Sequence, residues 1–104
     1  MSNSIPWGTA ANAQQSVTTV INLKDYLIEK QELDLINADK WTVSVKDNDM
    51  MMFDNGNIPT TTLGEPLTAG QSYQVTAPPD KINYVSVTGT AKITFSGEKS
   101  TPYN

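Results

Sequence analysis

"PLTAGQSYQVTAPPDKINYVSVTGTAKITFSG", residues 66–97, contains three runs in which apolar and polar side chains alternate. Tyr73, Val75 and Ala77 form one apolar series, and residues 91, 93 and 95 form another with the same period of two. This period is typical of antiparallel strands that have one face on a core and the other in water. Proline, aspartate and glycine separate the runs at 78–80 and 89–90, where turns are expected. In the middle run we expect Val85 and Val87 on one face and Tyr84 on the opposite one.

The pattern continues upstream of this segment. "WTVSVKD", residues 41–47, places Trp41, Val43 and Val45 on one face of a strand. "SVTTVINL", residues 16–23, is rich in β-branched residues and predicts the first strand. "IPTTTLGEPL", residues 58–67, holds two prolines and a glycine, which favours a loop or an edge strand.

Residues 24–40 are the charge-dense part of the chain, and their periodicity is mixed. We expect a strand followed by a loop at 37–40, with a short helix over 24–32 as the alternative. Counted together, about seven short strands with frequent turn signals predict an all-β fold. The expected architecture is an antiparallel β-sandwich, jelly-roll or Ig-like, or a small barrel.

A chain of 104 residues predicts one domain. Residues 1–15 are small and polar apart from Ile5, Pro6 and Trp7, and we interpret them as an extended N-terminal arm that these three residues anchor. The alternative is a terminus that folds back on its own domain. The sandwich is expected over 16–97, and a polar C-terminal tail over 98–104.

Three absences in the composition exclude classes of chemistry. The chain has no cysteine and no histidine, which removes disulfides, thiolate metal sites and the usual general base. All of its basic residues are lysines, and its formal net charge is −4, so we expect no nucleic-acid partner. No apolar run reaches the length of a membrane span, and the first residues lack the features of a signal peptide. We expect no cofactor.

Two groups of acidic residues are candidate sites. Oxygen ligands for calcium are present at Asp47, Asp49, Asp54, Asn55 and Asn57. The spacing of an EF-hand fails there, because methionines stand at required positions, so turn chemistry is the favoured interpretation. Paired carboxylates of a glycosidase would have to come from Glu29, Glu32, Asp34 and Asp39, which lie in a lysine-interleaved run typical of a solvated face. We therefore expect no catalytic and no metal-binding residues.

Methionines and aromatic residues suggest contact surfaces. Three methionines at 50–52 must place at least one side chain on each face of a strand, so Met50 and Met52 are candidate partner-contact residues, together with Ile5, Pro6 and Trp7. The alternative is a twisted edge strand with one partly exposed methionine. A carbohydrate platform would use exposed aromatic rings. Trp41 and Tyr73 are in phase with the core, so the rings that remain free are those of Trp7, Tyr84 and Tyr103.

Residues 66–97 also resemble a pattern found in small virion proteins of bacteriophages. The matching positions are Pro66, Leu67, Ala69, Gly70, Gln71, Ala77, Pro78, Pro79, Val87, Gly89, Thr90 and Ala91. The resemblance implies a structural role in the virion, as a capsid decoration (cement) protein, a head-fibre base or a minor tail or spike component. It implies the major capsid protein or other virion subunits as partners, and a homo-oligomer, with a trimer as the first guess. The alternative function is a carbohydrate- or receptor-binding β module, such as an adhesin or a fibre tip.

Overall fold

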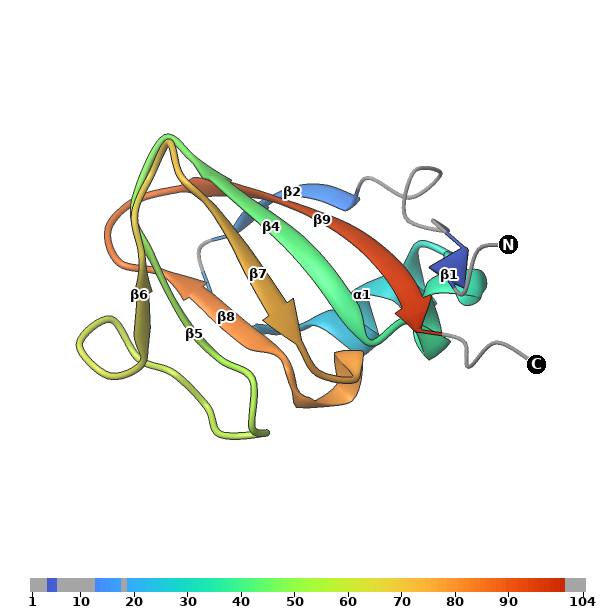
Figure 1. Cartoon of the computed structure of the whole chain (residues 1–104). Coiled ribbons are helices and arrows are strands. Elements are labelled where there is room, and N and C mark those ends of the chain that lie inside the picture. Colours follow the sequence, from blue (N-terminus) through green and yellow to red (C-terminus); the bar gives the residue numbers. More distant parts are fainter. Residues whose placement is uncertain (1–3, 6–12, 18, 101–104) are drawn as a thin grey trace.

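Two antiparallel β-sheets that face each other make up most of the protein (Figure 1). The structure is a computed structural model, and it describes residues 4–5, 13–17 and 19–100. The first sheet contains β1 (Ser4–Ile5), β2 (Ala13–Val17), β4 (Lys40–Lys46), β7 (Ser72–Thr76) and β9 (Ala91–Ser100). The second contains β3 (Ile21–Asn22), β5 (Met50–Phe53), β6 (Glu65–Leu67) and β8 (Asn83–Ser86). The prediction of an all-β, antiparallel fold is confirmed.

The strand pairs are nested within one another. β5 pairs with β6, β4 with β7, β3 with β8 and β2 with β9, and every pair is antiparallel. The chain from β2 to β5 is thus one arm of a long ribbon, and the chain from β6 to β9 returns along it. Two further pairs, β4 with β9 and β5 with β8, roll the ribbon into sheets of order β2-β9-β4-β7 and β3-β8-β5-β6. Within the described residues, β7 and β6 are therefore neighbouring edges of opposite sheets.

The core lies between the sheets and follows the predicted alternation. Trp41, Val43 and Val45 of β4 are buried, as are Ala91, Ile93 and Phe95 of β9. The register sets Val43 opposite Phe95, so the apolar residues of the two central strands share one face. Val75 and Ala77 are also buried, whereas Tyr73 is half-buried at the margin of the core. The inward series predicted for β4, β7 and β9 are confirmed.

The indole of Trp41 lies over Gly97, its cross-strand partner in β9. A Cβ atom added to Gly97 would be 2.6 Å from Cε3 and 2.9 Å from Cη2 of this ring, inside any real carbon–carbon contact. The Trp41 Nε1–H donates a hydrogen bond of 2.9 Å to the carbonyl of Ala77, and the ring of Phe95 meets it edge-on with centroids 6.0 Å apart. Contacts from three sides therefore hold the indole in place.

The segment after β3 is helical, so the predicted strand there is wrong and the alternative helix is confirmed. Helix α1 spans Leu23–Glu29, and the 3-10 helix η2 spans Leu33–Asn37. The Asn22 side chain caps α1 by accepting a hydrogen bond of 3.2 Å from the Asp25 N–H. Leu23, Tyr26 and Leu27 are buried, which is the spacing of one helical face. The strand predicted over 16–23 is divided between β2 in one sheet and β3 in the other.

Every residue of β8 is buried, so the expectation that Tyr84 faces outward is wrong. Tyr84 is fully buried and packs on Phe95, with ring centroids 5.0 Å apart. On the other face of β8, the Asn83 Nδ2–H donates to the Asn57 carbonyl at 2.9 Å, and Asn83 Oδ1 accepts from Asn22 Nδ2 at 2.8 Å. The β5–β6 loop thus lies against this face, and both faces of β8 are covered. The 3-10 helix η3, Pro79–Lys81, precedes this strand.

Both predicted domain boundaries fall inside strands. β1 and β2 pair with β9, so residues 4–5 and 13–15, which were assigned to the arm, form strand pairs with the sandwich. Ile5 lies opposite Lys99 in this pairing. β9 continues to Ser100, beyond the boundary at 97. Pro6 and Trp7 lie outside the described residues, as does the end of the predicted tail.

Candidate functional site

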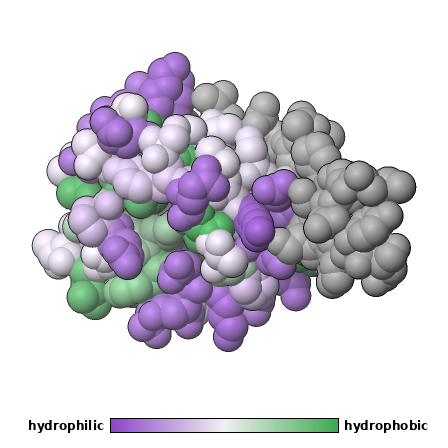
Figure 2. Space-filling view, in the orientation of Figure 1, coloured by the Kyte–Doolittle hydropathy of each residue, from purple (hydrophilic) through white to green (hydrophobic). Residues whose placement is uncertain are grey.

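A cleft lies between the edge strands β6 and β7. Figure 1 shows these two strands, which a turn joins at one end. The volume of the cleft is about 220 Å³, and its lining includes Met52, Asp54, Glu65, Leu67, Tyr73 and Val75. Met52, Leu67 and Val75 are buried and form an apolar floor that is continuous with the core. Asp54 and Glu65 are exposed and form the rim. In the space-filling view, pale green apolar surface lies between purple hydrophilic side chains on this side of the molecule (Figure 2).

The register of the strands explains this arrangement. Glu65 lies opposite Met52, so it stands on the inner face of the second sheet, at an edge where water reaches it. Tyr73 comes from the inner face of β7. Its hydroxyl oxygen accepts a hydrogen bond of 2.6 Å from the Thr68 N–H, which ties the ring to the turn between β6 and β7. The cleft therefore has an acidic rim and an apolar floor, and the ring of Tyr73, held by its hydrogen bond to Thr68, forms one wall.

The backbone of β7 has an open side next to the cleft. At its two ends, Gln71 accepts a hydrogen bond from the Val45 N–H at 3.2 Å, and Ala77 donates one to the Asp39 carbonyl at 2.9 Å. Backbone groups alternate in direction along a strand, so the odd-numbered residues of β7 bond to β4. The N–H and C=O groups of Ser72, Gln74 and Thr76 consequently face away from β4. No strand covers this side among the described residues.

The outer face beside this edge carries uncharged hydrogen-bonding groups. The hydroxyls of Ser44 and Ser72 are hydrogen-bonded at 2.9 Å, and Gln74 Nε2 donates to Thr42 Oγ1 at 3.1 Å. Cross-strand pairs of this kind stabilise a sheet by about 0.2–1 kcal/mol each. Because these hydrogen bonds direct the outward side chains of β7 toward β4, the backbone edge of β7 stays accessible.

Asp49 links the turns at one end of the sandwich. Its Oδ1 accepts a hydrogen bond of 2.9 Å from the Ala69 N–H, and its carbonyl accepts one of 2.9 Å from the Val87 N–H. The neighbouring Asn48 Nδ2–H donates to the Thr90 carbonyl at 2.7 Å. The β4–β5 turn therefore joins the β6–β7 turn and the β8–β9 turn. This is the turn chemistry that the sequence favoured over calcium.

The considered calcium ligands are not brought together. Asp47 and Asp49 precede β5, whereas Asp54, Asn55 and Asn57 follow it. Among the residues that the structure describes, no three His, Cys, Asp or Glu side chains are grouped as a metal site would require. Asn55 instead accepts a hydrogen bond of 3.0 Å from the Asn57 N–H, within its own turn.

Replacing Asp49 by alanine should lower the free energy of unfolding by about 1–2 kcal/mol, because the Ala69 N–H loses a charged acceptor. The replacement Asp49→Asn keeps an oxygen at the same place and should cost less than half as much. Urea unfolding followed by tryptophan fluorescence measures both. Equal losses for the two variants would show that the contact to Ala69 does not stabilise the turns.

Met50 and Met52 do not present their side chains on the outer surface of the folded monomer, so the expected contact surface around both is not found, and Met52 contributes only to the floor of the cleft. They are 0 % and 4 % exposed and belong to the core. Met51 is the outward methionine, and β5 lies between β8 and β6, so it is not an edge strand. A Cβ atom on Gly64 would lie 3.1 Å from Met51 Cβ and 3.3 Å from Pro59 Cβ. The chain's own loop therefore lies against Met51, where a neighbouring subunit had been considered.

Within the described part of the chain, the aromatic residues do not form one exposed platform. Trp41 and Tyr84 are buried, and Trp7 and Tyr103 lie outside the described residues. Among the described residues, two aromatic rings are partly exposed, that of Tyr73 in the wall of the cleft and that of Phe53 at the end of β5. Large exposed apolar side chains occur elsewhere, with Ile58 and Leu63 in the β5–β6 loop 60 % and 58 % exposed.

The carboxylates Glu29, Glu32, Asp34 and Asp39 are spread over α1, η2 and the residues that flank η2. Burial raises the pKa of the Tyr26 hydroxyl, and the nearby charges of Glu29 and Glu32 add to this rise. The Lys30 ammonium lies 5.9 Å from the centre of the same ring. In the described part of the chain, no helix is long and apolar enough to cross a membrane.

Sequence reasoning did not bring Asp54 and Glu65 together at one cleft, because their proximity depends on which strands form the edges of the sheets. A weak signal was present in "GEPL", where a charge and a proline stand side by side before Leu67, as is typical of a protected edge. No protein-family model matches this chain, and no curated protein or solved structure matches it significantly.

Proposed function

We propose that the sandwich is a jelly roll and that the protein is a non-enzymatic structural component of a bacteriophage virion. The role would be that of a capsid decoration (cement) protein or of a minor capsid or spike component. The observation that carries the proposal is the nesting of four antiparallel pairs, β2·β9, β3·β8, β4·β7 and β5·β6. A jelly roll is a ribbon of eight strands rolled into two sheets, and viral capsid domains commonly use it. This step from fold to role is an analogy.

The resemblance of residues 66–97 to small virion proteins supports the same role. The matching positions lie in β6, at the first residue of β9 and in the turns that join β6, β7, β8 and β9, and none of them lies within β7 or β8. They include the turns at 68–71 and 87–90, which Asn48 and Asp49 tie to the β4–β5 turn. The matched residues thus serve the architecture, which is what a scaffold of a particle requires.

Assembly would use the N-terminal segment and the open sheet edges. Apolar anchors at Ile5, Pro6 and Trp7 would be buried on a neighbouring capsid subunit, and an edge such as β7 would accept a strand. The partners would be the major capsid protein or other virion subunits, in a closed homo-oligomer such as a trimer. The site of action would be the virion, which is assembled in the host cytoplasm.

Removing residues 1–12, which leaves β2 intact, should abolish attachment to particles while the domain stays folded. Loss of the apolar anchors is the physical reason. Co-sedimentation with virions measures attachment, and thermal unfolding checks the fold. A matched control replaces residues 1–12 by a glycine–serine segment of equal length and should fail equally. Full attachment of the shortened chain would contradict the role of this segment.

The second candidate function, carbohydrate or receptor binding, is supported by one observation. The half-buried ring of Tyr73 lines a cleft whose rim carries two carboxylates. Sugars combine stacking on aromatic rings with hydrogen bonds to acidic and amide groups. Binding on a glycan array that Tyr73→Ala removes would favour this function over assembly.

A further inference from the structure

We propose that β7 accepts one strand of a neighbouring polypeptide, and that this strand inserts a lysine or arginine side chain into the cleft between β6 and β7. The inference deepens the proposed assembly role, on which it relies only for the source of the strand. The juxtaposition of an open backbone edge with an acidic, apolar-floored cleft carries it.

The two edges beside the cleft differ in how they are protected against pairing. β6 has three residues, among them Pro66, which cannot donate a backbone hydrogen bond, and Glu65, an inward-facing charge. These are devices that natural sheets use to block strand addition. β7 has five residues, SYQVT, without charge or proline, and all five types are compatible with strands. Of the two edges, β7 is the one left suitable for pairing.

The register determines where an added strand would direct its side chains. The groups of Ser72, Gln74 and Thr76 that face away from β4 would bond to it. Residues of the added strand opposite these three would extend the polar outer face. Residues opposite Tyr73 and Val75 would point inward, over the cleft, because side chains opposite each other share a face of the sheet.

The cleft matches a long basic side chain. Its floor of Met52, Leu67 and Val75 would cover an aliphatic stem, and Asp54 and Glu65 at the rim would bind the cationic head. No ion pair to either carboxylate occurs among the described residues. The volume of about 220 Å³ is below the roughly 300–1,000 Å³ of most small-molecule sites. A single side chain therefore fits better than an oligosaccharide.

Two peptide probes test the proposal on the intact protein. One is Ser-Thr-Val-Thr-Lys-Thr-Ser with blocked ends, and the other carries norleucine in place of lysine, which keeps the stem and removes the charge. NMR titration should show the lysine peptide slowing amide hydrogen exchange at Ser72, Gln74 and Thr76, with no added protection at Tyr73 and Val75. The norleucine peptide should bind about tenfold more weakly, a modest loss because the carboxylates are exposed.

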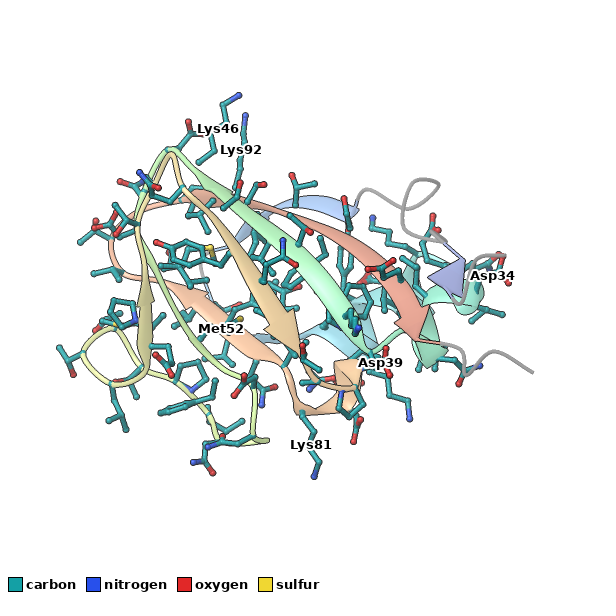
Figure 3. All side chains as sticks on the ribbon, in the orientation of Figure 1. Asp34, Asp39, Lys46, Met52, Lys81 and Lys92 are labelled. Carbon is teal, nitrogen blue, oxygen red and sulfur yellow. The ribbon has the colours of Figure 1, made fainter. Side chains whose placement is uncertain are left out.

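Variants separate the edge from the cleft. Gln74→Pro removes one outward donor without touching the β4 ladder, and it should abolish protection by the peptide. The double replacement Asp54→Asn with Glu65→Gln should weaken the lysine peptide about tenfold and leave the norleucine peptide unchanged. Its control, Glu29→Gln with Asp34→Asn, changes the charge equally, and Figure 3 places Asp34 at one end of the molecule, away from Met52. The control should bind like the original chain.

The outcomes against the proposal are distinct. Absence of protection at the β7 amides with millimolar lysine peptide would overturn it, and so would equal binding of both peptides. Shifts at Tyr73 and Asp54 with glucose, galactose or N-acetylglucosamine, in place of peptide binding, would make the cleft a sugar site. Particle attachment that survives Gln74→Pro, without peptide binding, would remove this inference and leave the assembly role. Peptide binding without any particle attachment would support this inference and contradict the assembly role.

Discussion

A chain carrying Gly97→Ala should unfold at about 2 M less urea than the original, a loss of about 3 kcal/mol. The added methyl group would be placed 2.6 Å from Trp41 Cε3, so either the indole or β9 has to move. Neither moves easily, because the indole is hydrogen-bonded to Ala77 and β9 lies between β4 and the N-terminal strands. Against a total stability of about 5–15 kcal/mol for a domain, this is a large fraction.

A double-mutant cycle identifies the cause of that loss. In a Trp41→Leu background the space above residue 97 is open, so Gly97→Ala should there cost less than about 1 kcal/mol. Thr94→Val, on the outer face of the same strand, serves as the control for β9 itself and should change the free energy of unfolding by less than about 0.5 kcal/mol. Additive losses in the cycle would show that the indole does not determine the need for glycine.

The replacement Asn83→Leu should also lower the free energy of unfolding by about 3 kcal/mol. Leucine has a similar size, but it leaves the Asn57 carbonyl and the Asn22 amide without their partner in a partly buried place. Asn22 Nδ2 keeps its hydrogen bond of 3.0 Å to the Asp80 carbonyl, whereas the β5–β6 loop loses its hydrogen bonds to the outer face of β8. Urea unfolding gives the loss, and faster amide exchange at Asn57 would locate it.

Asn83→Asp adds a pH dependence. The introduced carboxylate would face the carbonyls of Gly56 and Asn57, so its folded-state pKa should lie above the unfolded value of about 3.9. The variant should match the original most closely below this pH and lose stability as the pH rises through the raised pKa. Asn55→Asp is the control, because Asn55 acts as an acceptor through Oδ1, which aspartate retains. A gap between Asn83→Asp and the original chain that is constant from pH 3 to 7 would contradict the arrangement.

Strands with one solvent-exposed face were predictable, because apolar and polar side chains alternate along them with a period of two. This holds for β4, β7 and β9, where Val43, Val75 and Ile93 are all inward as expected. β8 was predicted with the wrong face outward, since its pattern of Asn83, Tyr84, Val85 and Ser86 is ambiguous once a loop covers the second face. The apolar residues of α1, Leu23, Tyr26 and Leu27, have helical spacing in the sequence. The charged residues among them and the β-branched run before them made this spacing hard to recognise.

The cleft required knowledge of topology. Asp54, Glu65 and Tyr73 come from three different strand ends, and nothing local to any of them indicates that β6 and β7 are neighbouring edges. The inward position of Met50 and Met52 was missed for the same reason. A methionine in a strand faces a partner or a core according to whether another sheet lies above it, and the facing sheet is built from strands both close to β5 in the chain, such as β4, and far from it, such as β9.

The central place of β9 has a consequence for the synthesis of the protein. β9 is the last described strand in the chain, yet it lies between β4 and β2. During translation, β4 therefore has its partner β7 on one side while its other edge stays open until residues 91–98 have been made. The nascent chain can close the β5·β6 hairpin early, but the pairing of residues 13–17 with 91–95 spans most of its length. Such distant pairing forms slowly. The edge of β4, on which another chain could pair, would therefore stay exposed on the nascent chain until β9 has been made.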